Sequence, residues 1–275
     1  MEDKASASSF SETVLYTKGI QMKSFMKFLL VVAVSSVCFA NGVRAEDSSE
    51  SGSSMEVTYS AGVYSRYLGQ WSGYVFDKRP SIQGDIGVSF ANGIYLDIWS
   101  ARQIGAKKDG VSGNEVDFTV GYATEVLGLS VDTSLTYYDL SPVLEGRRDN
   151  VWAPVIKVSK DFGDESLSIS PFVRMEVDIP DAGSSFSGGM YLTGGAEAKI
   201  SLLEDLSLCL ASYFTLDDGA YDGDQNVIFG QTASLQYEIG DWILTLPSFL
   251  LTTPIESDSC RKTETCFGFS VEGKF

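Results

Sequence analysis

From Met55 to its end, the chain is divided into segments of about 10–13 residues in which polar and apolar side chains alternate one by one. In the segment 167–177, Leu167, Ile169 and Val173 belong to one face, whereas Ser168 and Arg174 belong to the other. An α-helix would instead bring together apolar residues three and four positions apart. Period-two alternation therefore predicts β-strands with one apolar and one polar face.

The connections between these segments are alternately short and long. We predict twelve strands, roughly at residues 56–67, 80–91, 93–103, 114–126, 128–138, 151–161, 166–177, 189–200, 206–216, 226–238, 241–251 and 265–275. Tight turns alternate with longer connections near residues 68–79, 104–113, 139–150, 178–188, 217–225 and 252–264. Bacterial transmembrane barrels have this asymmetry, with short periplasmic turns and longer external loops, whereas a soluble sandwich has no reason for it. The predicted fold class is all-β, a transmembrane antiparallel up-and-down β-barrel of about twelve strands in the bacterial outer membrane.

Charged residues are confined to one face of the predicted strands. Away from the strand ends, the apolar face of all twelve carries no charge, as expected where a charge in lipid costs about 2–4 kcal/mol. The opposite face carries eight acidic and four basic residues, which we predict to line the pore: Arg66, Asp85, Asp97, Asp117, Asp132, Lys157, Arg174, Glu176, Glu197, Lys199, Glu238 and Glu272. An excess of inward acids would favour cations over anions in a water-filled lumen.

The number of strands does not determine the width of the lumen. Barrels of eight strands are filled by side chains and barrels of sixteen hold a channel, so twelve lies between these cases. The charges could therefore line a pore or pair with each other across a plugged interior. Inward aromatic residues would narrow the bore further: Tyr64, Tyr95, Tyr138, Tyr191 and Phe172.

The N-terminal region resembles an export signal. Lys23 and Lys27 precede an apolar run at 28–40, and Val43-Arg44-Ala45 supplies small residues at the offsets of a cleavage site. We predict an N-terminal extension and cleaved signal peptide at 1–45, a disordered acidic, Ser-rich tail at 46–55 and a barrel at 56–275. The alternative is an uncleaved anchor, but the run is short of the roughly 20 residues that span a bilayer. The true start is left open among Met1, Met22 and Met26.

Net charge excludes one class of partner. Residues 1–45 hold 3 of the 37 acidic and 5 of the 20 basic residues, so the remainder has a formal charge of −19. A chain this acidic repels nucleic acid. We expect it to contact outer-membrane lipid and lipopolysaccharide, the barrel-assembly machinery and small hydrophilic solutes, with homo-oligomerisation left open.

Three cysteines follow the predicted signal. Cys260 and Cys266 lie six residues apart in a polar, loop-like stretch, so in an oxidising compartment we expect a small disulfide ring. The alternative is a metal site, which is disfavoured because the chain has no histidine and only one further cysteine after the predicted signal. Cys209 is expected to be a free thiol.

The last segment has a pattern of its own. Phe267, Phe269, Val271 and the terminal Phe275 alternate with small or charged residues. A final strand that ends in an aromatic residue resembles the signal that barrel-assembly machinery reads on outer-membrane proteins. The alternative is an ordinary closing edge strand, although an open edge of this kind would be unfavourable in water.

Several stretches resemble the TorF-like family of porins. The likeness comprises Val63-Tyr64-Ser65-Arg66-Tyr67-Leu68-Gly69, residues 80–84, residues 93–100, Gly121-Tyr122 and residues 135–138. It is concentrated in the first third of the predicted barrel, and Leu68 stands where the family usually continues with Arg-Gly after its tyrosine. The resemblance implies an outer-membrane barrel with a channel role. It brings no established solute and no catalytic residues.

The absence of histidine argues against an enzyme. It removes Ser-His-Asp catalysis, a histidine general base and most catalytic zinc sites, and no cofactor motif is present. Carboxylate pairs at Asp217-Asp218 and at Asp222 and Asp224 resemble a glycosidase site or a calcium loop only superficially, and we interpret them as a solvated loop. The function expected from the sequence is passive diffusion of small hydrophilic solutes with a weak cation preference. The alternative is a non-conducting structural or surface-binding barrel that acts through its external loops.

Overall fold

The computed structural model describes residues 55–105, 114–140, 150–182, 184, 186–220, 224–257 and 261–274. The predicted signal peptide and residues 46–54 of the predicted tail lie outside this part of the chain. Over the described ranges, no helix is sufficiently long and apolar to cross a bilayer.

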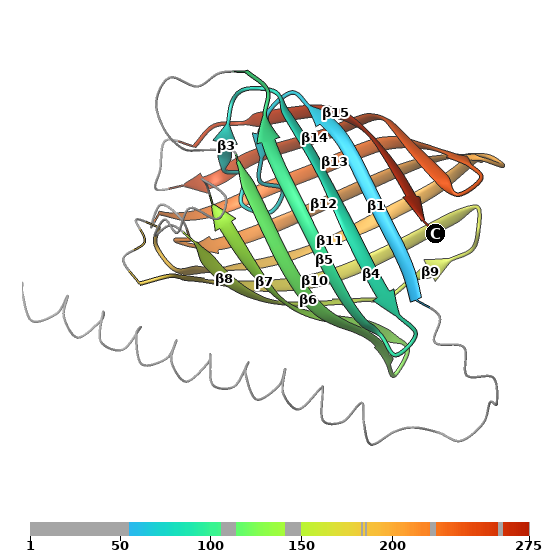
Figure 1. Ribbon diagram of the computed structural model, residues 1–275, viewed down its shortest axis with the longest axis horizontal. Coiled ribbons are helices and arrows are strands. Elements are labelled where there is room, and N and C mark those ends of the chain that lie inside the picture. The colour runs from blue at the N-terminus through green and yellow to red at the C-terminus, as the bar shows by residue number, and fades with distance from the viewer. Residues whose placement is uncertain are drawn as a thin grey trace, which may run out of the picture. The chain divides into compact units, whose positions relative to one another are not determined.

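Long antiparallel strands account for most of the described residues (Figure 1). They are β1 (Met55–Tyr64), β4 (Ser81–Phe90), β5 (Ile94–Gln103), β6 (Glu115–Val126), β7 (Leu129–Leu140), β8 (Val151–Ser159), β10 (Leu167–Pro180), β11 (Gly189–Leu203), β12 (Leu206–Asp218), β13 (Gln225–Ile239), β14 (Trp242–Ser257) and β15 (Glu264–Lys274). Three short strands accompany them, β2 (Tyr67–Leu68), β3 (Val75–Asp77) and β9 (Phe162–Gly163).

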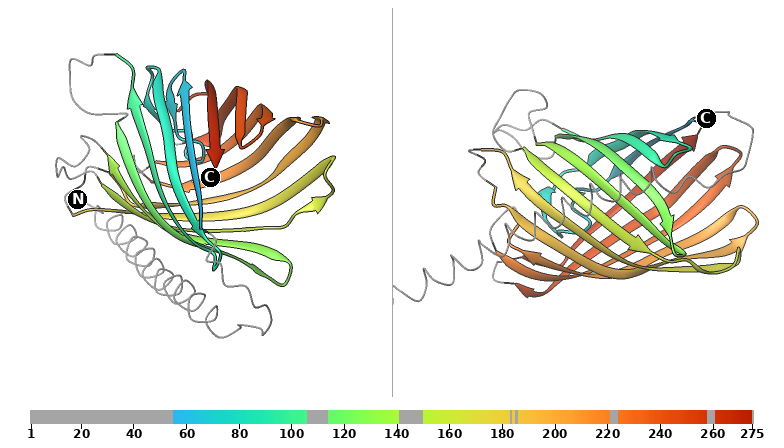
Figure 2. Two further views of the ribbon diagram at one scale, coloured as in Figure 1. Left: turned by 45° about the vertical axis from the view of Figure 1, so that its right-hand side comes forward. Right: turned by 90° about the horizontal axis from the view of Figure 1, so that it is seen from below.

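The long strands close into a barrel. Each pairs with the next along the chain, β10 pairs with both β8 and β11, and β1 pairs with β15 from Thr58 opposite Lys274 to Tyr64 opposite Gly268. Figure 2 shows the tilted strands of this wall from two further directions. Closure removes both sheet edges, so the backbone groups of every long strand find partners within the wall. The predicted antiparallel barrel of twelve long strands is confirmed over the described residues.

Strand boundaries differ from the prediction where the wall extends beyond the alternating pattern. β14 continues to Ser257, so part of the predicted loop 252–264 belongs to the sheet. The composition around Pro254 is typical of a loop, but this segment pairs with β13. The register is irregular there, between Val227 and Ile228, and proline is tolerated at such irregularities. β1 begins at Met55, which the prediction assigned to the tail, and it ends three residues early, at Tyr64.

The outer surface of the barrel is apolar along the middle of its strands. Ile86, Ile98 and Phe118 lie side by side on β4, β5 and β6, and they are 60%, 50% and 40% exposed. Phe214 and Phe269 are similarly exposed on other strands. A monomeric soluble protein rarely exposes so continuous an apolar band, whereas lipid solvates it. The protein is therefore an outer-membrane barrel.

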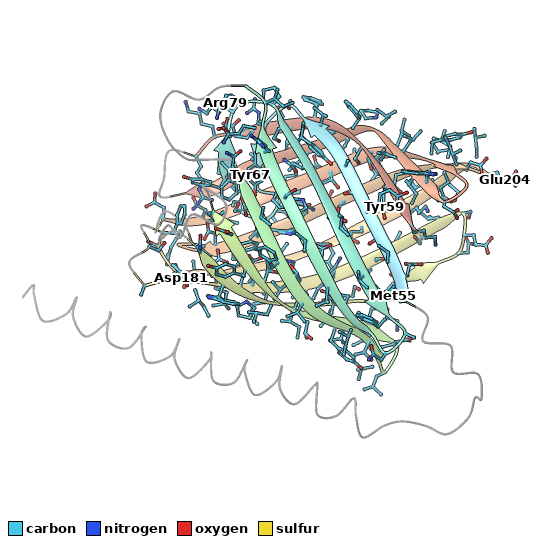
Figure 3. All side chains as sticks on the ribbon, in the orientation of Figure 1. Met55, Tyr59, Tyr67, Arg79, Asp181 and Glu204 are labelled. Carbon is cyan, nitrogen blue, oxygen red and sulfur yellow. The ribbon has the colours of Figure 1, made fainter. Side chains whose placement is uncertain are left out.

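The two ends of the barrel differ in their connections. Figure 3 shows Met55 and Glu204 at one end, and Arg79 and Asp181 at the other. The first end carries the tight turns, including the one in which the Asp164 carboxylate accepts hydrogen bonds from the Ser166 side chain and backbone. These bonds favour the charged form and lower the pKa of Asp164.

We predict that Ile98→Arg destabilises the barrel because it places a charge at mid-depth in lipid. The free energy of unfolding, measured by denaturant titration in lipid vesicles, should fall by about 2–4 kcal/mol. The matched variant Ile98→Leu should stay close to the wild type. Equal stability of the arginine variant would contradict a lipid-facing position for this side chain.

Candidate pore and its inward loop

The segment between β1 and β4 folds into the barrel. We call residues 65–80 the inward loop. Its short strands β2 and β3 pair with each other, Tyr67 opposite Asp77 and Leu68 opposite Val75. Tyr67 and Leu68 are both buried, at 7% exposure. The sequence prediction placed residues 68–79 among the external loops, and this part of the prediction is wrong because the segment has partners inside the barrel.

The inward loop reaches the opposite wall of the lumen. The Trp71 ring lies 5.9 Å from that of Phe172 on β10 and 4.9 Å from that of Tyr213 on β12, measured between ring centroids. The Arg174 guanidinium, also on β10, stands 5.2 Å from the centre of the Trp71 ring. β10 is six strands away from β1 around the barrel in either direction. Trp71 therefore anchors a segment that spans the lumen.

Hydrogen bonds to backbone carbonyls anchor the tip of the loop on both sides of Trp71. The Tyr213 hydroxyl donates to the Gln70 carbonyl at 2.6 Å, and Arg261 Nη1 donates to the Ser72 carbonyl at 2.7 Å. The Tyr213 ring has room because Gly230 faces it on β13, where a Cβ atom would fall 2.1 Å from the tyrosine Cζ. Satisfied buried carbonyls are needed for any segment inside a barrel.

The base of the loop is held by two acidic side chains. The Tyr67 hydroxyl donates to the Glu115 carboxylate on β6, and Arg66 forms an ion pair with Glu264 on β15. Arg66 was predicted to line the pore as part of a strand, but it follows the end of β1 and belongs to the inward loop.

All four predicted pore-lining bases are paired with acids. In three of the pairs both residues belong to the side of the wall formed by β8 to β13. In the fourth pair, Arg66 of the inward loop contacts β15. The pairs are Arg66 with Glu264, Lys157 with Glu197 at 2.9 Å, Arg174 with Glu176, and Lys199 with Glu238 at 3.1 Å. The two charges of each pair offset one another within the lumen.

The other side of the wall carries predicted acids that have no basic partner. Asp85, Asp97, Asp117 and Asp132 come from the four consecutive strands β4 to β7, and no described Lys or Arg forms an ion pair with them. Asp85 accepts a hydrogen bond from the Ser60 hydroxyl, and Asp132 accepts one from the Tyr95 hydroxyl at 2.8 Å. The lumen is thus acidic on one side and charge-paired on the other. The remaining predicted lining residue, Glu272, lies opposite Ser60 on the neighbouring strand β1.

Glu115, Asp178 and Asp217, which are buried on described strands of the wall, were missed as lumen residues. Glu115 was within reach, because it precedes Asp117 by two residues on the same face of β6. Asp178 and Asp217 were assigned to loops, but β10 and β12 extend to include them and each is 3% exposed. The interpretation of Asp217 as part of a solvated loop is therefore wrong, since it pairs with Arg261 at 3.2 Å inside the barrel. Asp222 lies outside the described residues.

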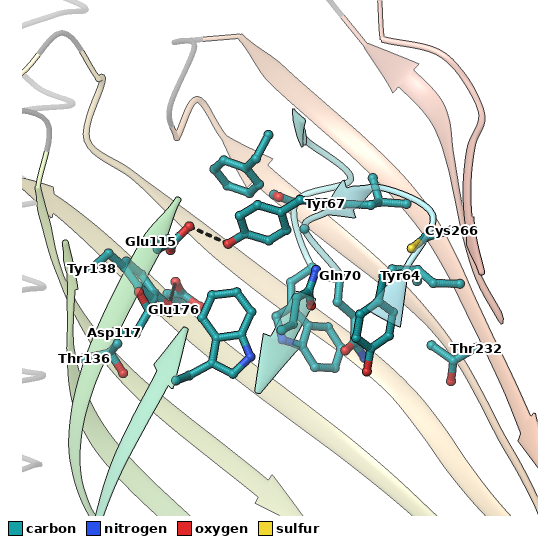
Figure 4. A pocket seen from close by; sticks show the side chains of 18 of the residues that line it. Tyr64, Tyr67, Gln70, Glu115, Asp117, Thr136, Tyr138, Glu176, Thr232 and Cys266 are labelled. Carbon is teal, nitrogen blue, oxygen red and sulfur yellow. Dashed lines mark hydrogen bonds between the residues drawn. The ribbon is translucent and has the colours of Figure 1, made fainter. Parts of the chain in front are cut away.

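A cavity of about 550 Å³ lies between the inward loop and the acidic side of the wall. Figure 4 shows Glu115, Asp117 and Glu176 together on one side of it, with Tyr64 and Thr232 on the other. The predicted narrowing residues Tyr64, Tyr138 and Tyr191 all contribute to its lining.

The cysteines and the terminal aromatic residues are only partly described. Cys266 is a buried free thiol that donates to the Arg66 carbonyl at 3.3 Å, and Cys209 is also free. The free thiol at Cys266 disagrees with the predicted disulfide to Cys260, which itself lies outside the described residues. Phe267 and Phe269 point outward and are about half exposed, and Val271 shares their face of β15. Phe275 falls outside the described part, and the assembly signal stays a prediction.

Solved outer-membrane proteins are similar in fold. The KdgM porin in complex with disordered oligogalacturonate is 14% identical, with 80% of this chain and 99% of that chain covered and a TM-score of 0.49. The NanC porin is 13% identical, covering 81% and 100%, at a TM-score of 0.48. An outer-membrane channel from Pseudomonas putida F1 is 10% identical, covering 84% and 100%, at 0.46. The barrel of this chain is established by its own strand pairing, independently of these distant likenesses.

Sequence comparison places the chain in a family without assigning it a solute. No curated protein matches the sequence. The sequence model of one bacterial family matches residues 48–205, which is more than half of the chain. The chain belongs to this family, Gcw_chp, which is described as bacterial protein of unknown function.

Proposed function

We propose that this outer-membrane barrel is a narrow channel for passive diffusion of small hydrophilic solutes, and that it weakly prefers cations. The observation that carries the proposal is the inward loop, which crosses a lumen whose wall bears acids without basic partners among the described residues. A loop that narrows a charged lumen supports discrimination by size and by sign of charge. We propose that all twelve predicted charged residues contribute to this lining.

The charge preference would arise from the two sides of the lumen. The ion pairs on β8 to β13 contribute little net field, because each base lies next to an acid. The acids on β4 to β7 form no ion pair with a described base, and in a low-dielectric, confined bore their field would raise the local concentration of cations. Passage would then involve no bond chemistry, only partial replacement of a solute's water shell by hydroxyls and carboxylates of the wall.

Several finer features belong to the same proposal. The resemblance to TorF-like porins supports the channel role, and the outward Phe267 and Phe269 on the last strand are consistent with recognition by barrel-assembly machinery. The 1–45 signal peptide would direct export. The alternative, a non-conducting barrel that binds through external loops, predicts no current at all and is thereby separated from the channel by bilayer recording.

We predict that Trp71→Ala widens the pore. Removing the ring eliminates its contacts with Phe172, Tyr213 and Arg174, so the inward loop loses its anchor on the far wall. Single-channel conductance in planar bilayers should rise by roughly twofold or more. The control Trp242→Ala removes an outward indole near the tight turns and should leave conductance unchanged. No current steps from the wild-type protein would refute the channel, and unchanged conductance in Trp71→Ala would refute the constriction.

We also predict that the double variant Asp97→Asn with Asp132→Asn reduces cation preference. It neutralises two of the four acids that lack a basic partner among the described residues, so the reversal potential in a potassium chloride gradient should move toward zero by roughly half. Glu56→Gln, which changes an exposed acid paired with Lys274 at the barrel rim, serves as the control. A reversal potential that is the same in the double variant and the wild type would show that these acids do not set selectivity.

A further inference from the structure

We infer that the cavity beneath the inward loop is a binding site for a small organic cation that bears a primary ammonium group. The inference names a solute class for the proposed channel and in that sense rests on it. It is carried by a buried carboxylate with one oxygen that lacks a hydrogen-bond partner among the described residues, by the aromatic rings around it and by the size of the cavity. The three observations come from different parts of the wall and the loop.

The unsatisfied group is Asp117, which lines the cavity on β6 (Figure 4). Its side chain is 8% exposed, and its Oδ1 atom has no hydrogen-bond partner among the described residues. The flanking acids differ in this respect, since Glu115 accepts from Tyr67, and Glu176 accepts from Tyr138 and pairs with Arg174. Because a buried acceptor is destabilised unless it receives a donor, Asp117 is, among the acids that line the cavity, the one whose free acceptor a ligand can satisfy.

The chemistry required at Asp117 is that of a charged donor. A primary ammonium carries three N–H groups and a positive charge. Its hydrogen bonds to a carboxylate are charge-assisted and therefore stronger than hydrogen bonds between neutral groups. A quaternary ammonium supplies the charge but no donor, and a neutral hydroxyl supplies the donor but no charge. Asp97, which also lines the cavity and has no basic partner among the described residues, offers a second carboxylate for the far end of a diamine.

Aromatic side chains supply the rest of the site. Trp99 stands on β5 opposite Asp117 in the strand register, and its ring centroid lies 5.6 Å from that of Tyr67. Trp71 and Phe76 line the same cavity from the inward loop. Aromatic faces attract cations and pack against methylene chains, so they fit an alkylammonium better than a bare metal ion.

The cavity also has the volume of a small-ligand site. Its 550 Å³ lies within the range of roughly 300–1,000 Å³ typical of pockets that bind small molecules. A linear diamine such as putrescine has room in this volume to keep part of its water shell. Partial hydration suits a solute that must also leave, since transport requires binding that is favourable but weak.

The test is calorimetric titration of the full-length protein in detergent, which reports binding whether or not the barrel conducts. The probes are putrescine, butanediol as its uncharged counterpart, and tetramethylammonium as a cation without donors. We expect saturable binding of putrescine, with binding of the other two weaker by roughly tenfold or more. Equal binding of butanediol would overturn the requirement for charge, and equal binding of tetramethylammonium would overturn the requirement for donors.

Variants locate the site. Asp117→Asn should weaken putrescine binding by roughly tenfold to a hundredfold, because the ligand loses a charge-assisted bond. Trp99→Leu removes an aromatic face with little loss of apolar bulk and should also weaken binding, which keeps the test decisive if the first variant folds poorly. Asp161→Asn changes an exposed acid that does not line the cavity and serves as the control. Wild-type affinity in both cavity variants would refute the site, and an absence of current steps in bilayers would refute the channel alone.

Discussion

The need to satisfy every backbone polar group inside lipid determines the rest of this structure. A membrane-spanning strand cannot turn to water for hydrogen bonds, so the sheet must close on itself, and β1 and β15 provide that closure. Once the wall is closed, successive side chains along each strand face either the lipid or the lumen. Apolar residues such as Ile86 and Ile98 face lipid, and every charge in the membrane-spanning part must face the lumen.

This arrangement leaves a wide and highly charged lumen inside the barrel. A ring of twelve strands is wider than the eight-stranded barrels whose side chains fill the interior, and it collects many charged groups in a confined space. The protein resolves both difficulties with one segment. The inward loop occupies the bore, covers aromatic rings on the far wall and donates or accepts the hydrogen bonds that several wall residues need, while an acidic side of the lumen remains open to a cavity.

Most of the wall could be predicted from the sequence, whereas the loop could not. Alternation is a local property, and it predicted a shared face for the four acids on β4 to β7, of which Asp97 and Asp117 line the cavity. Trp71 gave no such signal, because it stands between Gly69-Gln70 and Ser72-Gly73, a composition typical of turns. Its burial depends on Phe172 and Tyr213, about a hundred residues or more away along the chain. Asp217 was wrongly predicted for a related reason, because its Asp- and Gly-rich surroundings indicate solvent while its partner Arg261 lies far along the sequence.

The order of the anchors along the chain has a consequence for assembly. The inward loop is the first connection of the barrel, yet the groups that hold its tip arrive much later, from Phe172 on β10 to Arg261 just before β15. The strands β1 and β4 that flank the loop provide none of these contacts to its tip. The constriction therefore requires strands from the second half of the barrel as well as the first connection. Closure of the wall and narrowing of the bore therefore depend on the same C-terminal half of the chain, so a barrel that lacks those strands would also lack its constriction.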